Sequence, residues 1–245
     1  MSRIIALTYT ILAVTALGTT TLAYSADVDP SLRKDLERIA QKRIYFGHQS
    51  VGENLLGGVQ QLSTIASIPI CVLEIPTANG VKATGLGYTF VARNGDPFQK
   101  LKSFEQAMGQ QPTMLDIALV KFCFVDITAD TDVKAVFARY RTTIDGLKAR
   151  NPGTTFVHIT APLTTVQSGF KGSLKKLIGR APYGAIENIR REEYNELLRQ
   201  AYWGREPLFD LARVKSTTLD ESAVTGEWKG SVAPAMAPAY TRTDT

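Results

Sequence analysis

A histidine and a serine stand two residues apart in "IYFGHQSVGENLLGG", residues 44–58, where an apolar strand-like run passes into a helical pattern. Ser50 at such a turn suits two roles. Its hydroxyl can cap the helix by accepting from the first free N–H groups. It can equally be a nucleophile, because those N–H groups and the helix dipole favour negative charge that develops nearby. The stretch alone leaves both roles open.

A nucleophilic serine needs a base that takes its proton, and that base is most often histidine. The chain contains two histidines, His48 and His158. His48 is either that base or a packed turn residue, whereas His158 lies inside an apolar run and is expected to be buried and hydrogen-bonded. Lys121 also lies in an apolar run, where an unpaired charge would be costly. We expect it to reach an edge of the sheet or to pair with a carboxylate such as Asp126, as part of the site or as a structural ion pair.

The sequence contains no signal for a nucleotide-binding site or a metal site. The first strand-like run is not followed by a phosphate-binding glycine motif, and His, Cys and carboxylate residues do not cluster with metal-ligand spacing. We therefore expect no cofactor and no metal ion.

The elements that would position Ser50 alternate along the chain. Apolar runs that are continuous, as in strands covered on both faces, span residues 43–48, 68–75, 117–127, 154–162 and 207–214. Helical patterns begin at Pro30, Val51, Pro97, Val133 and about Glu187. This alternation predicts a doubly wound α/β fold with a parallel sheet of five strands. Ligands bind at the carboxyl ends of such strands, which is the edge that carries Ser50.

Three segments depart from the pattern. Residues 76–95 are rich in glycine and polar residues, and residues 163–186 contain glycines and a basic cluster, so both are expected to overhang the site as loops. Residues 217–245 show no apolar periodicity and are expected to be irregular, without a closing helix. Cys71 and Cys123 lie in separate strand-like runs and are expected to be buried free thiols.

The N-terminus has a separate character. Arg3 is the only charge in residues 1–25, which contain an apolar run and end in small residues around Ser25. We interpret residues 1–25 as a signal peptide of a secreted or periplasmic protein; an N-terminal membrane anchor is the alternative. Residues 26–216 would form the α/β domain, with no membrane span after cleavage. The formal charge is +5, but nothing resembles a nucleic-acid-binding motif, so no nucleic-acid partner is expected. Oligomeric state stays open.

The turn "YFGHQSVG" resembles the SGNH/GDSL hydrolases, which are serine esterases on a flavodoxin-like sheet, in a variant where GHQS replaces GDS. The resemblance implies that Ser50 is the nucleophile and that its N–H is an oxyanion donor. It places the loop glycine of the second motif in "RNGDP" at Gly95, with Asn94 beside it. The third motif, Gly-x-Asn-Asp, corresponds to residues 123–126: Asp126 is kept, but the oxyanion Asn is replaced by Val125, so Asn94 is the candidate to supply that donor.

The last family motif, Asp-x-x-His, supplies the base and its orienting carboxylate. Asp244 is the position that fits, and the histidine would fall two residues after Thr245, so the resemblance implies a chain cut before its base and before the family's closing helix. The sequence thus predicts an exported ester hydrolase acting on a lipid or carbohydrate ester, feeble or inactive as given. The alternative is a non-catalytic extracytoplasmic binding protein on the same fold, which would hold an anionic glycan or ester through the basic residues 171–180.

Overall fold

A six-stranded, all-parallel sheet forms the centre of the molecule. The computed structural model describes residues 28–241. The strands of the sheet are β1 (Arg43–His48), β2 (Val72–Glu74), β3 (Gly85–Phe90), β4 (Ile117–Val120), β5 (Thr155–Ile159) and β6 (Leu208–Phe209). Their order is β2-β3-β1-β4-β5-β6, and every pairing is parallel. The predicted α/β fold with a parallel sheet is confirmed, with six strands instead of five.

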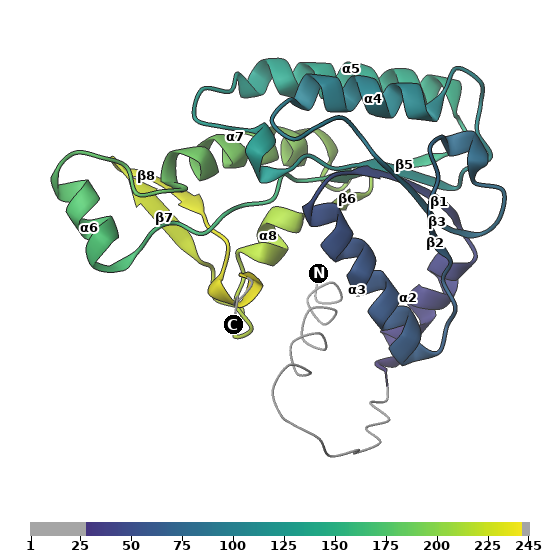
Figure 1. Ribbon diagram of the computed structural model, residues 1–245, viewed down its shortest axis with the longest axis horizontal. Coiled ribbons are helices and arrows are strands. Elements are labelled where there is room, and N and C mark those ends of the chain that lie inside the picture. The colour runs from purple at the N-terminus through teal and green to yellow at the C-terminus, as the bar shows by residue number, and fades with distance from the viewer. Residues whose placement is uncertain (1–27, 242–245) are drawn as a thin grey trace.

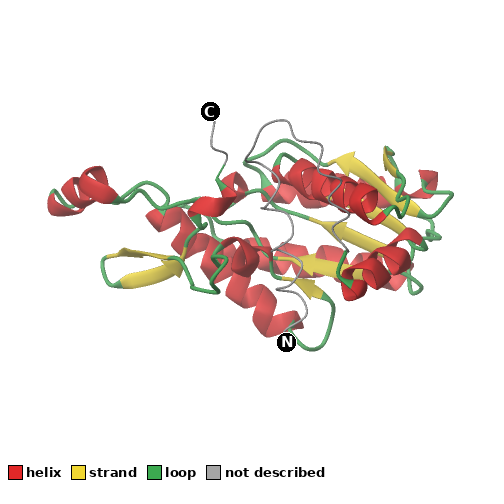
Figure 2. Ribbon diagram, turned by 90° about the horizontal axis from the view of Figure 1, so that it is seen from below, coloured by secondary structure: helices red, strands yellow, loops and turns green. Residues whose placement is uncertain are grey.

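Helices cover both faces of the sheet (Figure 1). The covering helices are α2 (Pro30–Ala40), α3 (Val51–Ala66), α4 (Pro97–Met108), α5 (Val133–Arg150), α7 (Ala185–Tyr202) and α8 (Leu211–Lys215), whereas α6 (Gly169–Leu177) stands apart from the sheet. One face carries α4, α5 and α7, which bury the main core against side chains such as Tyr45 and Val120. The other face carries α2, α3 and α8, with Phe46 and Leu56 in its core. Figure 2 shows the strands between these two layers.

Capping residues set several helix starts where the sequence predicts them. Asp29 caps α2 by accepting from the backbone N–H of Ser31, and Asp96 caps α4 by accepting from that of Gln99. Proline follows each of these two aspartates at the first helical position. An N–H group at that position has no acceptor within the helix, so the N–H that proline lacks is not needed there.

The strand that the sequence analysis missed is β3, which lies within the segment expected to be a loop. Its glycines suggested a turn, but they serve close packing. Gly85 has φ +130°, and a Cβ there would stand 2.6 Å from the carbonyl oxygen of Cys71; a Cβ on Gly87 would stand 2.7 Å from the side chain of Val81. The extra strand separates β2 from β1.

Two other segments differ from expectation. Residues 163–186 contain α6 rather than only loop, and the segment expected to be irregular contains an antiparallel hairpin, β7 (Thr225–Trp228) and β8 (Ser231–Pro234), which lies beside α7 (Figure 1). Both cysteines are free as predicted, but Cys71 is exposed because its run forms a strand only from Val72 onward; Cys123 is buried. No helix within residues 28–241 is long and apolar enough to cross a membrane.

The strand order places Ser50 at the reversal point of the sheet. From β1 the chain builds β2 and β3 on one side and then β4, β5 and β6 on the other. Loops that leave β1, β3 and β4 therefore start side by side at the carboxyl edge, where open α/β sheets bind ligands.

Candidate functional site

Ser50 forms a strained turn between β1 and α3. Its backbone has φ 47° and ψ −106°, whereas Ser67 at the other end of α3 has φ 54° and ψ 35°, an ordinary left-handed conformation. Positive φ outside that ordinary region costs a residue with a side chain roughly 1–3 kcal/mol. Such strain persists only where the surroundings impose it, and a strand-to-helix turn of this kind lifts a serine hydroxyl out of the sheet edge.

The hydroxyl of Ser50 does not cap the helix that follows. Ser50 is exposed and makes no side-chain hydrogen bond at the start of α3 within the described part of the chain. By contrast, Asp96 and Asp132 bond the first turns of α4 and α5. Of the two roles that the sequence left open, the geometry therefore disfavours the cap.

In the part of the chain that the structure describes, the backbone N–H of Ser50 is a free donor at this turn. The N–H of Gly52 donates to the carbonyl of Gln49 at 3.1 Å, and that of Glu53 donates to the carbonyl of Ser50 at 2.7 Å. The N–H of Ser50 itself makes no hydrogen bond with any residue between 28 and 241. It is therefore free to donate to an anion beside the hydroxyl.

Neighbouring strands hold the turn in place. The side chain of Gln49 donates through Nε2 to the carbonyl of Val91 after β3, at 2.7 Å, and its own carbonyl accepts from Sγ of Cys123 after β4, at 3.4 Å. Gly47 has no room for a side chain, because a Cβ would stand 2.6 Å from the ring of Phe104 on α4. The strain at Ser50 is thus imposed from both sides of β1.

Asp126 joins the loop after β3 to the turn after β4. It is buried, and its carboxylate accepts from the backbone N–H of Gly95 at 2.7 Å, the backbone N–H of Cys123 at 2.5 Å and Nζ of Lys100 at 2.5 Å. The N–H of Gly95 is therefore occupied in this structure and does not face outward, unlike the predicted oxyanion donor. Asp126 positions the two loops and offers no free oxygen to a ligand.

Asn94 is oriented by Lys100. Nζ of Lys100 donates to Oδ1 of Asn94 at 2.7 Å. Because an ammonium group can only donate, the oxygen of the amide must point to Lys100 and the NH₂ group away from it. Asn94 is exposed, and its NH₂ group has no partner within the described residues. It remains the candidate side-chain oxyanion donor.

Lys100 is a site residue that the sequence analysis missed. Its side chain is fully buried, and a signal was present: it stands four residues before Phe104 and next to Leu101, on the apolar face of α4. A lysine on such a face needs a buried partner, which here is Asp126.

His48 does not take the position of a base. It is fully buried, with its ring against those of Phe46, Tyr88 and Phe90 at centroid distances of 4.8–5.3 Å. Neither ring nitrogen has a hydrogen-bond partner among the residues described. Burial, followed by the charges of Lys121 and Lys100, lowers its pKa to about 4. The ring is a neutral packing element under the first turn of α3.

Lys121 lies behind the Ser50 turn without a carboxylate partner. It is fully buried, and its Nζ donates to Sγ of Cys123 at 3.3 Å. The expected pairing with Asp126 is absent within residues 28–241, where that carboxylate pairs with Lys100. Burial lowers the pKa of Lys121. The pKa of Lys215, after β6, is also lowered by burial and then by the charge of Lys121. Cationic groups thus gather behind the turn.

Two further predictions concern residues outside this cluster. His158 is buried and hydrogen-bonded as predicted, with Nδ1 2.8 Å from Oη of Tyr140 and Nε2 3.0 Å from Oε2 of Glu206. Asp244 and the predicted signal peptide, residues 1–25, lie outside the described residues. No group of three or more metal-ligating side chains occurs within the described ranges.

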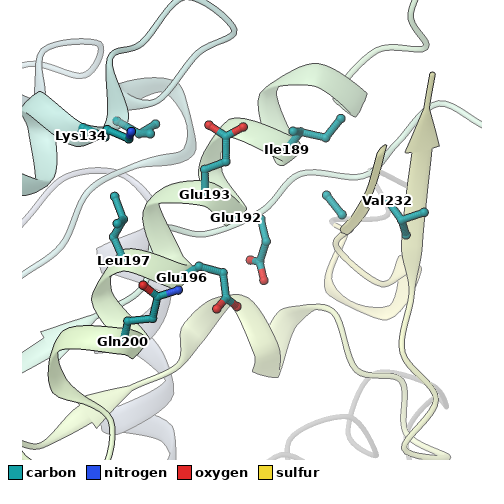
Figure 3. Close-up of a pocket in the computed structure, with 10 residues that line it drawn as sticks. Lys134, Ile189, Glu192, Glu193, Glu196, Leu197, Gln200 and Val232 are labelled. Atoms are coloured by element: carbon teal, nitrogen blue, oxygen red, sulfur yellow. The ribbon is translucent and has the colours of Figure 1, made fainter. Parts of the chain in front are cut away.

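Two cavities lie beyond the Ser50 turn. One of about 160 Å³ lies between the turn after β4, the segment after β5 and α7, on the same sheet edge, with Val125, Thr164 and Arg191 in its wall. The other, of about 400 Å³, lies between α7, the start of α5 and the hairpin, lined in part by Glu192 and Val232 (Figure 3). Its lining contains none of the predicted site residues.

Comparisons with known proteins add little to the geometry. No protein-family model matches this sequence, and no curated protein matches it. A solved structure described as "The structure of a putative platelet activating factor from Streptococcus pneumonia" is similar over 85% of this chain and 85% of that chain, with a TM-score of 0.45 and 10% sequence identity. The fold assignment stands on the strand order and the parallel register described above.

Proposed function

We propose that this protein is an exported serine ester hydrolase of the SGNH/GDSL type, with Ser50 as its nucleophile. The observation that carries the proposal is the strained turn of Ser50, whose hydroxyl and N–H are both free while neighbouring strands fix the turn. A helix cap needs no such strain, whereas a nucleophile that must project from a sheet edge does.

The chemistry follows from the groups around that turn. Oγ of Ser50 attacks the carbonyl carbon of an acyl ester while a base takes its proton, and the tetrahedral oxyanion accepts from the N–H of Ser50 and the NH₂ of Asn94. The base then protonates the departing alkoxide, which leaves an acyl-enzyme that water hydrolyses. We assign the base to the Asp-x-x-His motif that would begin at Asp244. Lys121, a buried cation behind the turn, favours the negative charge of the oxyanion.

A lipid or carbohydrate ester remains the proposed substrate class. The cavity beside Val125 and Arg191 suits a small part of that substrate, because it opens on the edge that carries Ser50.

Hydrolysis of a short-chain aryl ester tests the proposal. The assay compares Ser50→Ala with Ser67→Ala, which removes an exposed hydroxyl at a positive-φ position on the same helix. Each variant is made in the full-length gene product. We expect Ser50→Ala to lower kcat by about 10⁴-fold or more, with Ser67→Ala close to wild type. Equal activity of both variants would remove Ser50 from the mechanism.

One observation favours a second function. No histidine or carboxylate contacts Oγ of Ser50 within residues 28–241, which is also what a non-catalytic binding protein would present. If the full-length gene product retained an anionic ester or glycan without turning it over, that result would favour binding over hydrolysis.

A further inference from the structure

Helix α6 exposes an apolar stripe. Phe170 and Leu177 are each 83% exposed, Ile178, which follows the helix, is 59% exposed, and Leu174 is 47% exposed. Positions 170, 174, 177 and 178 fall within about 100° of one face of a helix, because each residue advances it by about 100°. Most exposed apolar residues of a protein are scattered singly; these four form one continuous surface.

The stripe points away from the rest of the molecule. Gly172 is the buried residue of α6, and a Cβ there would stand 2.5 Å from the carbonyl oxygen of Gln167. Position 172 lies about 160–200° around the helix from positions 170 and 174. The helix therefore turns its glycine face to the loop that precedes it and presents its apolar face to solvent, the reverse of an ordinary surface helix.

The charged residues next to the stripe in the sequence are all basic. Lys171, Lys175, Lys176 and Arg180 flank it, and no acidic residue occurs between Asp145 and Glu187. None of these four basic residues forms an ion pair within the described chain. The sequence analysis identified this basic cluster but expected it in a loop, so the apolar stripe among its charges was missed.

The helix also stands at an extremity of the molecule. Both views show α6 at one end, held by connecting loops and clear of the helices that cover the sheet (Figures 1 and 2). The segment that carries α6 starts and ends at one place, because the N–H of Gln167 donates to the carbonyl of Tyr183 at 3.0 Å. A flat surface could therefore reach the stripe without touching the sheet.

We propose that α6 docks the protein on an anionic phospholipid bilayer. The apolar stripe enters the boundary between headgroups and acyl chains, and the flanking lysines and arginine lie among the anionic headgroups. Charge complementarity selects this occupant: an uncharged apolar partner would leave four cations unmatched, and a soluble polyanion would leave the stripe in water.

Vesicle co-sedimentation tests the proposal, with vesicles of phosphatidylcholine alone or mixed with phosphatidylserine. Wild type should bind the mixed vesicles, less at high salt, and bind phosphatidylcholine much more weakly. Phe170→Ser with Leu177→Ser should lower the partition coefficient by about tenfold or more. Met114→Ser is the matched apolar control, since Met114 is 74% exposed and far from α6 in sequence.

The charge component has its own pair of variants. Lys171→Gln with Lys176→Gln should lower binding to the mixed vesicles by about tenfold or more, since each basic residue near such a surface contributes about a factor of five. Lys34→Gln with Lys82→Gln, at exposed positions elsewhere, should leave binding unchanged. Unchanged circular dichroism and melting temperature would show that all variants fold.

Several results would overturn the proposal. One is a folded wild type that does not bind the mixed vesicles. Another is unchanged vesicle binding in the Phe170→Ser, Leu177→Ser double variant. Self-association abolished by that double variant, without vesicle binding, would assign the stripe to a second copy of the chain. Binding is expected to be the same in Ser50→Ala, so failure of the proposed esterase activity leaves this test intact.

Discussion

The buried pair of Lys100 and Asp126 gives the sharpest test of how the site is held. Asp126→Asn keeps the size of the side chain and removes its charge. Lys100, whose side chain is fully buried, then has only neutral amide oxygens as side-chain acceptors, that of Asn94 and that of the substituted side chain. Removing one partner of a buried ion pair costs about 3–5 kcal/mol, because the remaining charge stays desolvated. We expect the free energy of unfolding of Asp126→Asn to fall by that amount.

The measurement is urea unfolding of the wild type and the variant, followed by circular dichroism. Asp35→Asn is the matched control: Asp35 pairs with Arg38 on the exposed surface, with side chains 58% and 65% accessible, where such pairs contribute about 0–1 kcal/mol. Lys100→Met combined with Asp126→Asn should cost less than the sum of the single changes, because neither charge is then left alone. A cost of Asp126→Asn below about 1 kcal/mol, equal to that of the control, would refute the organising role of this pair.

Three further outcomes are expected. Gly52→Ala should cost about 1–3 kcal/mol in urea unfolding, because its Cβ would stand 2.4 Å from the ring of His48, whereas Gly57→Ala on the same helix has nothing within 4 Å and should be neutral or stabilising. The pKa of His48 is lowered from 6.5 to about 4, so the unfolded chain binds the proton at a higher pH than the folded protein does. The free energy of unfolding should therefore be constant above pH 6.5 and fall by about 3 kcal/mol as the pH falls towards 4. His48→Phe should flatten this part of the stability–pH curve, and an unchanged slope would contradict the burial of His48. Asn94→Ala should lower kcat/KM for an aryl ester about 10²–10³-fold, while Asn79→Ala, at another exposed position, should not; equal effects would remove Asn94 from the oxyanion site.

The sequence predicted most of the fold because several helices carry their own start signals. Asp96 followed by Pro97 fixes the start of α4, and continuous apolar runs locate β1, β4 and β5. Strand β3 escaped because Gly85 and Gly87 are read locally as turn residues, and only the close approach of Cys71 and Val81 shows why they are glycines. Contacts between segments distant in the sequence cannot be read from either segment alone.

Only part of the candidate site could be predicted from the sequence, because contacts between distant segments shape it too. The position of Ser50 follows from strand and helix periodicity, but its backbone strain does not, because that strain is imposed by Gln49 bonding to Val91 and by Cys123. The sequence could not show that the N–H of Gly95 donates to the carboxylate of Asp126, since this hydrogen bond joins residues that are 31 positions apart. His48 stood close in sequence to Ser50 but points into an aromatic layer.

Covalent labelling of Ser50 is the most direct test of the central claim. The full-length gene product is treated with a fluorophosphonate, which transfers its phosphonyl group to an activated serine with loss of fluoride, and the labelled peptide is identified by mass spectrometry. We expect a single adduct on Ser50, absent in Ser50→Ala and unchanged in Ser67→Ala. An adduct on another serine, or none on a folded protein that hydrolyses esters, would show that Ser50 is not the nucleophile.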